Sequence, residues 1–133
     1  MRRLSLLALL IPLAAGCGGS GGHTTSVQTT SGSTVQRWIQ VEHLPKNAVP
    51  GAELFESTGC TACHTYAGSG TSVLGAPDLT AIGTKHYGIR FQVAHLECPS
   101  CVVHGSAMPP STSLSPTQLH RLAVFLEASR GTD

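Results

Sequence analysis

The sequence predicts a small all-α domain whose short helices are joined by a long glycine-rich loop. Helix signals occupy three stretches of the 133-residue chain, residues 48–60, 89–97 and 115–131. Residues 65–88 are rich in glycine, and loops of that length in compact domains are usually functional or wrapped around something. A chain of this length is expected to form one small domain once any targeting segment is removed.

The first predicted helix covers residues 48–60, with the sequence AVPGAELFESTGC. Asn47 is a possible N-cap, Pro50 suits the first turn, and Gly59 ends the helix. Phe55 is expected to face the interior.

The middle helix is predicted over residues 89–97. Ile89, Val93 and Leu96 fall at helical spacing there, which indicates one buried face. Pro99 then stops or restarts the helix.

The last helix has the clearest signals in the chain. Ser115 is a good N-cap, Pro116 fits the first helical position, and Gln118 completes a capping box. Gly131 is expected to end the helix in the left-handed conformation. The apolar stripe consists of Leu119, Leu122, Ala123 and Leu126, with Phe125 beside it.

Residues 1–16 are typical of an export signal. Arg2 and Arg3 are followed by an apolar run, residues 4–15, that is shorter than the ~20 residues a spanning helix needs. The small residues before Cys17 resemble the lipobox of bacterial lipoproteins, in which that cysteine is acylated. The same residues also fit an ordinary signal-peptidase site, which would make the protein soluble and secreted.

Residues 17–45 are predicted to be a lipid-anchored flexible tether and arm. From residue 18 to 36 the chain is rich in Gly, Ser and Thr and lacks periodicity. Residues 37–50 contain the first buriable side chains, Trp38 among them, and are expected to form an extended arm packed on the domain. The domain itself is predicted over residues 46–131.

Composition excludes some functions. The net charge is +1 and only 11% of residues are charged, so no basic patch for nucleic acid is expected. Aromatic residues make up only 5% of the chain, which leaves few large side chains for a core. Something besides side chains is therefore expected to fill part of the interior.

Each of the five cysteines can be assigned a bonding partner if the protein is exported. Cys17 would carry lipid, and the other four form two CxxC pairs, Cys60/Cys63 and Cys98/Cys101. Cysteines outside the cytoplasm are usually oxidised or otherwise bonded.

His64 follows the first pair directly, and CxxC followed by His is the attachment signature of a c-type haem. Thiols three residues apart on a helical turn, Cys60 and Cys63, reach the two vinyl groups of a porphyrin, and the histidine lies under the iron. Three other interpretations compete: a zinc site shared with the second CxxC, a disulfide, and a thioredoxin-like redox pair.

Met108 is predicted to be the sixth ligand of the iron. It is the only methionine besides the first residue, and a thioether suits a low-spin electron carrier. Pro109 and Pro110 stiffen the chain after it. His104 is the alternative sixth ligand. A bis-histidine haem is a further interpretation, because His86 and His95 lie in the same half of the domain.

Residues 49–130 resemble a class I (monohaem) bacterial cytochrome c. GAELFESTGCTACH resembles the family's first helix and haem motif, and GAPDL resembles the loop whose proline carbonyl accepts a hydrogen bond from the proximal histidine. Those two residues here would be Pro77 and His64. The segment GSAMPPSTSLSPTQLHRLAVFL resembles the methionine loop leading into the C-terminal helix. The resemblance implies that this helix crosses the first one near Gly51 and Phe55.

The resemblance implies one covalent haem c, held by Cys60, Cys63, His64 and Met108, and a carrier of single electrons rather than an enzyme. Its expected partners are redox proteins and, through the lipid anchor, the outer face of the cytoplasmic membrane, with no small-molecule substrate and no nucleic acid. The alternative is a haem-based sensor with a displaceable sixth ligand or a thiol-modulated haem.

The second CxxC departs from the family pattern. Because no histidine follows it directly, it is not a second haem site. A disulfide between Cys98 and Cys101 would brace the approach to Met108. A redox-active dithiol is the second interpretation, and a metal site that adds His104 is the third.

Overall fold

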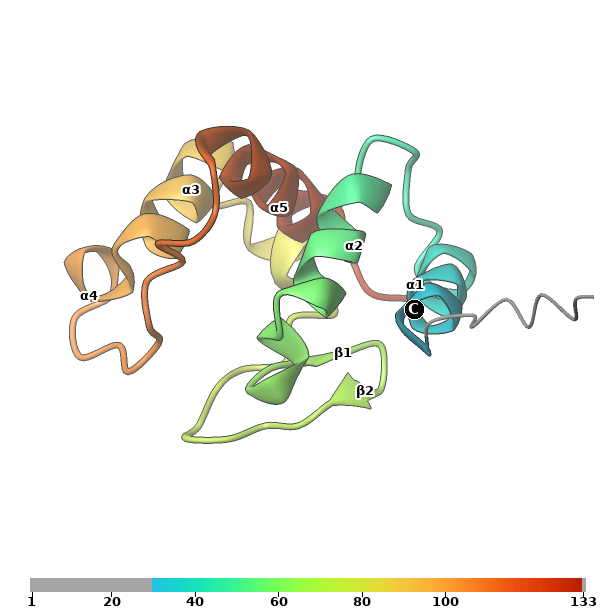
Figure 1. Ribbon diagram of the computed structural model, residues 1–133, viewed down its shortest axis with the longest axis horizontal. Coiled ribbons are helices and arrows are strands. Elements are labelled where there is room, and N and C mark those ends of the chain that lie inside the picture. The colour runs from blue at the N-terminus through green and yellow to red at the C-terminus, as the bar shows by residue number, and fades with distance from the viewer. Residues whose placement is uncertain (1–29, 133) are drawn as a thin grey trace, which may run out of the picture.

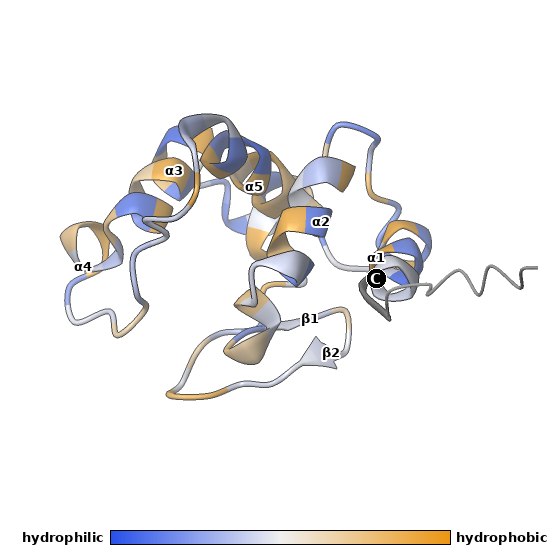
Figure 2. Cartoon of the chain, in the orientation of Figure 1, coloured by the Kyte–Doolittle hydropathy of each residue, from blue (hydrophilic) through white to orange (hydrophobic). Residues whose placement is uncertain are grey.

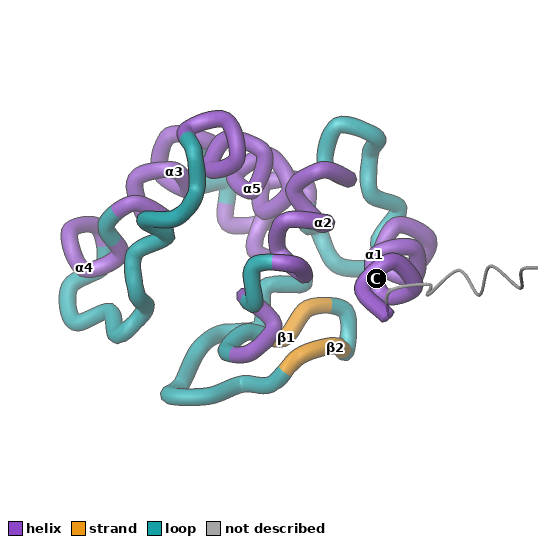
Figure 3. Tube along the Cα trace, viewed as in Figure 1, coloured by secondary structure: helices purple, strands orange, loops and turns teal. Residues whose placement is uncertain are grey.

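The computed structural model describes residues 30–132, and this part of the chain is mostly helical (Figures 1 and 3). The elements in order are α1 (Thr30–Val41), α2 (Val49–Ser57), the 3-10 helix η1 (Cys60–Ala62), β1 (Thr65–Tyr66), β2 (Ser69–Gly70), the 3-10 helix η2 (Ile82–Lys85), α3 (Ile89–Glu97), α4 (Pro99–Val102) and α5 (Pro116–Ala128). Strands β1 and β2 form a small antiparallel hairpin. The all-α class is thus confirmed for the described residues. The predicted signal segment, residues 1–16, and Cys17 lie outside them.

Helix α5 begins as predicted. The Ser115 hydroxyl accepts a hydrogen bond from the Gln118 backbone N–H, and the Gln118 side chain accepts one from the Ser115 N–H, which together form a capping box. The predicted end is wrong, because the helix stops at Ala128 and Ser129 is extended. The Ser129 hydroxyl donates to the Phe125 carbonyl at 2.8 Å and so satisfies one of the last helical acceptors. Gly131 does have φ 72°, but it lies beyond the cap.

Helix α2 begins without the predicted cap. Its N-cap is Ala48 rather than Asn47, and no side chain caps it, while a proline does occupy the first turn. The helix ends at Ser57. Gly59 then adopts a left-handed φ of 81°, which glycine tolerates, and redirects the chain into η1.

Helices α2 and α5 cross where Gly51 meets the backbone of α5. An added Cβ at Gly51 would lie 2.1 Å from the Arg121 carbonyl oxygen, so only glycine permits this approach. Helix α3 also packs against α5, and the Gln92 amide donates to the Glu127 carboxylate at 2.8 Å. Apolar residues are visible along α2, α3 and α5 in Figure 2, where these helices approach one another.

Residues 30–41 are helical, so the prediction of a flexible tether followed by an extended arm is wrong from Thr30 onward. Helix α1 packs against α2, and its Trp38 is fully buried. The Trp38 ring lies 5.0 Å from the Tyr66 ring, centroid to centroid, and its Nε1 donates to the Ser69 hydroxyl at 3.3 Å. The ordered domain therefore starts before residue 46.

Four of the chain's few aromatic side chains meet at the centre of this core. The rings of Trp38, Phe55, Tyr66 and Phe125 contact one another in edge-on, tilted and stacked arrangements. Aromatic side chains bury large areas, so this cluster supplies much of the core from few residues. The remaining two aromatic residues, Tyr87 and Phe91, lie on the wall of a cavity.

Candidate cofactor site

A cavity of about 480 Å³ opens among α2, α3, α5 and two loops. This volume lies within the ~300–1,000 Å³ range of small-molecule and cofactor sites. The predicted site residues Cys60, Cys63, His64, Pro77 and Met108 all line it. None of the described residues that line the cavity is an Asp, Glu, Lys or Arg. The wall is thus mostly apolar and carries no formal charge from those side chains.

The 3-10 helix η1 presents the CxxCH motif to the cavity. Backbone N–H groups of Cys63 and His64 donate to the Cys60 carbonyl at 3.1 and 2.9 Å, which closes a tight turn. Both cysteines are free and half-buried. Burial raises the pKa of the Cys60 thiol, and the Thr58 hydroxyl 3.6 Å from its sulfur partly opposes this. Neither sulfur is used in a disulfide, so both remain available for thioether bonds.

His64 is oriented by the loop that follows the hairpin. Its Nδ1 lies 2.9 Å from the Pro77 carbonyl oxygen, the pairing expected from the resemblance. Such a bond places the hydrogen on Nδ1 and leaves the Nε2 lone pair for a metal.

The Pro77 loop is itself tied back to the protein. Asp78 accepts hydrogen bonds from the Thr65 hydroxyl and from the Thr80 N–H, and the Leu79 N–H donates to the Thr65 carbonyl at 2.9 Å. Burial raises the pKa of Asp78, but these hydrogen bonds outweigh it and hold the pKa below its ordinary value. The carboxylate is therefore the form that secures the loop.

Met108 reaches the cavity from the loop between α4 and α5, and its side chain is partly buried against the core. Its N–H donates to the Ser106 hydroxyl at 3.3 Å. After the two prolines, the Ser111 N–H donates to the Leu96 carbonyl of α3 at 2.9 Å. The methionine is therefore held between two local anchors.

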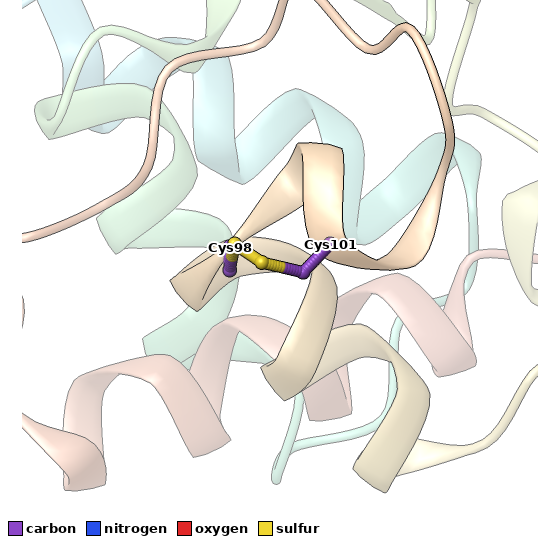
Figure 4. Close-up of a disulfide and its surroundings, with 2 residues drawn as sticks. All are labelled: Cys98 and Cys101. Atoms are coloured by element: carbon purple, nitrogen blue, oxygen red, sulfur yellow. A yellow bond between two sulfur atoms is a disulfide. The ribbon is translucent and has the colours of Figure 1, made fainter.

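A disulfide joins Cys98 to Cys101 (Figure 4), with the two Cα atoms 5.3 Å apart. It spans the single turn of α4, which restarts the chain at Pro99 after α3. Because both sulfur atoms belong to the disulfide, Cys98 and Cys101 offer no thiolate to bind a metal together with His104. No cluster of three or more Cys, His, Asp or Glu side chains suited to a metal ion occurs among residues 30–132.

The four histidines that the sequence offers as iron ligands separate into two groups. His64 and His95 line the cavity, whereas His86 and His104 do not and are exposed. Burial, and secondarily the nearby His64, lower the pKa of His95. His104, the alternative sixth ligand, thus lies outside the cavity, and of the two histidines named for a bis-histidine site only His95 lines it. The spacing of Tyr87, Phe91 and His95, each four residues from the next, is the signal that could have placed His95 on a shared face.

The residues present fit the covalent haem that the sequence predicts. The fit rests on the donor set: two free thiols on one turn, an imidazole with its Nδ1 hydrogen held by a carbonyl, and a thioether on the same uncharged wall. Comparison of the chain with models of protein families, with curated proteins and with solved structures finds no match. Within residues 30–132, no helix has the length and apolar character needed to span a membrane.

Proposed function

We propose that this protein is a monohaem cytochrome c of class I that carries single electrons between redox proteins. The observation that carries the proposal is the convergence of Cys60, Cys63, His64 and Met108 on one cavity, with the imidazole of His64 held by Pro77. The crossing of α2 and α5 at Gly51, expected from the resemblance, supports a cytochrome c fold.

In this function each residue has a defined task. Cys60 and Cys63 would bind the haem covalently, His64 and Met108 would ligate its iron, and Pro77 would orient the imidazole of His64. When bound, the haem supplies the one-electron couple between ferric and ferrous iron. With His64 and Met108 both bound to the iron, no substrate would be expected to reach it, and the protein would act by positioning the haem and by setting its potential.

The apolar wall has an electrostatic consequence. Because the lining carries no charged side chains, it would favour ferrous iron, which has the lower charge, over ferric iron. A neutral thioether ligand acts in the same direction, so we expect a positive reduction potential. Attachment through Cys17 would confine the carrier to the outer face of the cytoplasmic membrane.

The test is a pair of absorption spectra, oxidised and reduced, on protein matured with its haem. We expect the pigment to stay with the polypeptide after denaturation and extraction with acidified acetone. The ferric protein should show the charge-transfer band of iron bound to thioether sulfur, and Met108→Ala should abolish it. His104→Ala is the matched control and should retain the band. Pigment that washes out would overturn the proposal, and carbon monoxide binding to the reduced wild type at neutral pH would favour the sensor instead.

A further inference from the structure

Tyr87, Phe91 and His95 form a ladder of stacked rings on the cavity wall. The ring centroids of Tyr87 and Phe91 are 4.6 Å apart, and those of Phe91 and His95 are 6.1 Å apart with planes inclined by 5°. All three side chains line the cavity, and Tyr87 is half exposed at the outer end. The stack therefore fixes the plane of the His95 ring before any ligand is bound.

The two histidines on the wall differ at Nδ1. The Nδ1 of His64 is paired with the Pro77 carbonyl, as a metal-ligating histidine requires. The Nδ1 of His95 is buried and has no hydrogen-bond partner. A hydrogen there would be a buried donor without an acceptor, and a doubly protonated ring would add a buried charge. The hydrogen of His95 therefore belongs on Nε2, which makes this nitrogen a donor and not a lone-pair ligand.

We propose that His95 donates its Nε2 hydrogen to a carboxylate of the bound haem and is a positioning residue, not an iron ligand. This inference rests on the proposed function. It assigns the two cavity histidines opposite tasks, with His64 giving a lone pair to the metal and His95 giving a hydrogen to the edge of the ring.

The composition of the wall explains why a histidine would serve here. Haem carries two carboxylates, and a carboxylate near an apolar wall needs donors. The lining offers no Lys or Arg, and the Gln92 amide is already bound to Glu127. Among the other lining side chains, Tyr87 and Ser106 could each donate a hydrogen bond through a hydroxyl. Only His95 combines a partly buried ring, a ring plane held by stacking and a hydrogen directed to Nε2 by an unpaired Nδ1.

The experiment uses the haem-loaded full chain with the substitutions His95→Leu, His95→Gln and His95→Asn. A glutamine amide reaches about where Nε2 lies, whereas an asparagine amide reaches only about as far as Nδ1. The readouts are the thioether charge-transfer band, the infrared bands of haem labelled with ¹³C at its carboxylates, and the reduction potential. His104→Leu is the matched control, because that histidine is exposed and outside the cavity.

We expect His95→Leu to keep the charge-transfer band, to shift one carboxylate band and to lower the potential, since an unpaired carboxylate stabilises ferric iron. His95→Gln should restore both properties toward wild type, His95→Asn should not, and His104→Leu should match wild type. Loss of the charge-transfer band in His95→Leu would mean that His95 supports the methionine ligation itself, and this would overturn the inference. Unshifted carboxylate bands, or equal rescue by Asn and Gln, would also overturn it.

A second measurement needs no variant that could fail to mature. In the ferrous wild-type protein, nuclear magnetic resonance should find the His95 hydrogen on Nε2, with a dipolar contact to a propionate methylene. A hydrogen on Nδ1, or no such contact, would overturn the inference. Failure of the proposed function is distinguishable, because the wild-type chain would then lack covalent haem or the thioether band.

Discussion

The Cα of Gly51 on α2 faces the backbone carbonyl of Arg121 on α5, and this contact sets the crossing of the two helices. A Cβ at Gly51 would lie 2.1 Å from that oxygen and 2.5 Å from the Cβ of Phe125. Both neighbours are rigid parts of the chain, so neither can move aside cheaply. Since η1 follows α2 and α5 lines the cavity, the crossing also positions the CxxCH turn.

Gly51→Ala is therefore expected to destabilise the haem-loaded protein by ~1–3 kcal/mol, the usual cost of overpacking. Chemical denaturation followed by haem absorbance measures this. Gly32→Ala is the matched control, because an added Cβ at Gly32, also within a helix, has nothing within 4 Å. That control should be neutral or stabilising through helix propensity, by up to ~1 kcal/mol. Equal effects at the two sites would contradict the steric account.

Trp38→Ala should cost ~3–5 kcal/mol, because a fully buried indole and its contacts with three other rings are lost. The measurement is the free energy of unfolding in denaturant. Val41→Ala, an exposed position on the same helix, should change stability by less than ~0.5 kcal/mol. If Trp38→Ala proved as mild as Val41→Ala, α1 would not be part of the cooperative core.

Replacing both Cys98 and Cys101 by serine should lower stability by roughly 2 kcal/mol, the chain-entropy value for so short a loop. Met108 is held by its own anchors at Ser106 and Ser111, so the thioether charge-transfer band should persist. The spectrum and the unfolding free energy are measured on the same sample. A band that disappears in the double variant, and in the wild type after the disulfide is reduced, its thiols are alkylated and the iron is reoxidised, would instead favour a redox-active pair.

Local sequence signals predicted the parts of the fold that depend on neighbouring residues. The capping box of α5 and the bounds of α3 were predictable, since Ser115, Gln118 and the apolar spacing of residues 89–97 act within a turn or two. Helix α1 was missed because its first residues, Thr, Ser and Gly, are poor helix formers. Its helical state depends on the packing of Trp38 against residues that are distant in the sequence. A short stretch of sequence carries no information about such contacts.

The candidate site divides in the same way. The CxxCH motif and the lone methionine near two prolines are short-range patterns, so Cys60, Cys63, His64 and Met108 were predictable. The contact between His64 and Pro77 joins residues 13 apart and came from the family resemblance rather than from spacing. The role proposed for His95 could not come from the sequence, because the unpaired state of its Nδ1 depends on what surrounds the ring.

Tyr66 should make the protein sensitive to alkaline pH. Burial raises its pKa from 10.0 to about 12, the hydrogen bond with Ser129 opposes this, and Glu42 and Asp78 add to the rise. Because the folded pKa lies above the unfolded one, its contribution to stability is complete below about pH 10 and is lost as the pH rises toward 12. The test starts from Tyr87→Phe, which leaves Tyr66 as the only tyrosine. The unfolding free energy of this variant should fall more steeply between pH 10 and 12 than that of Tyr66→Phe/Tyr87→Phe. Lysines titrate alike in both proteins, so parallel curves would mean that Tyr66 ionises without cost in the folded state.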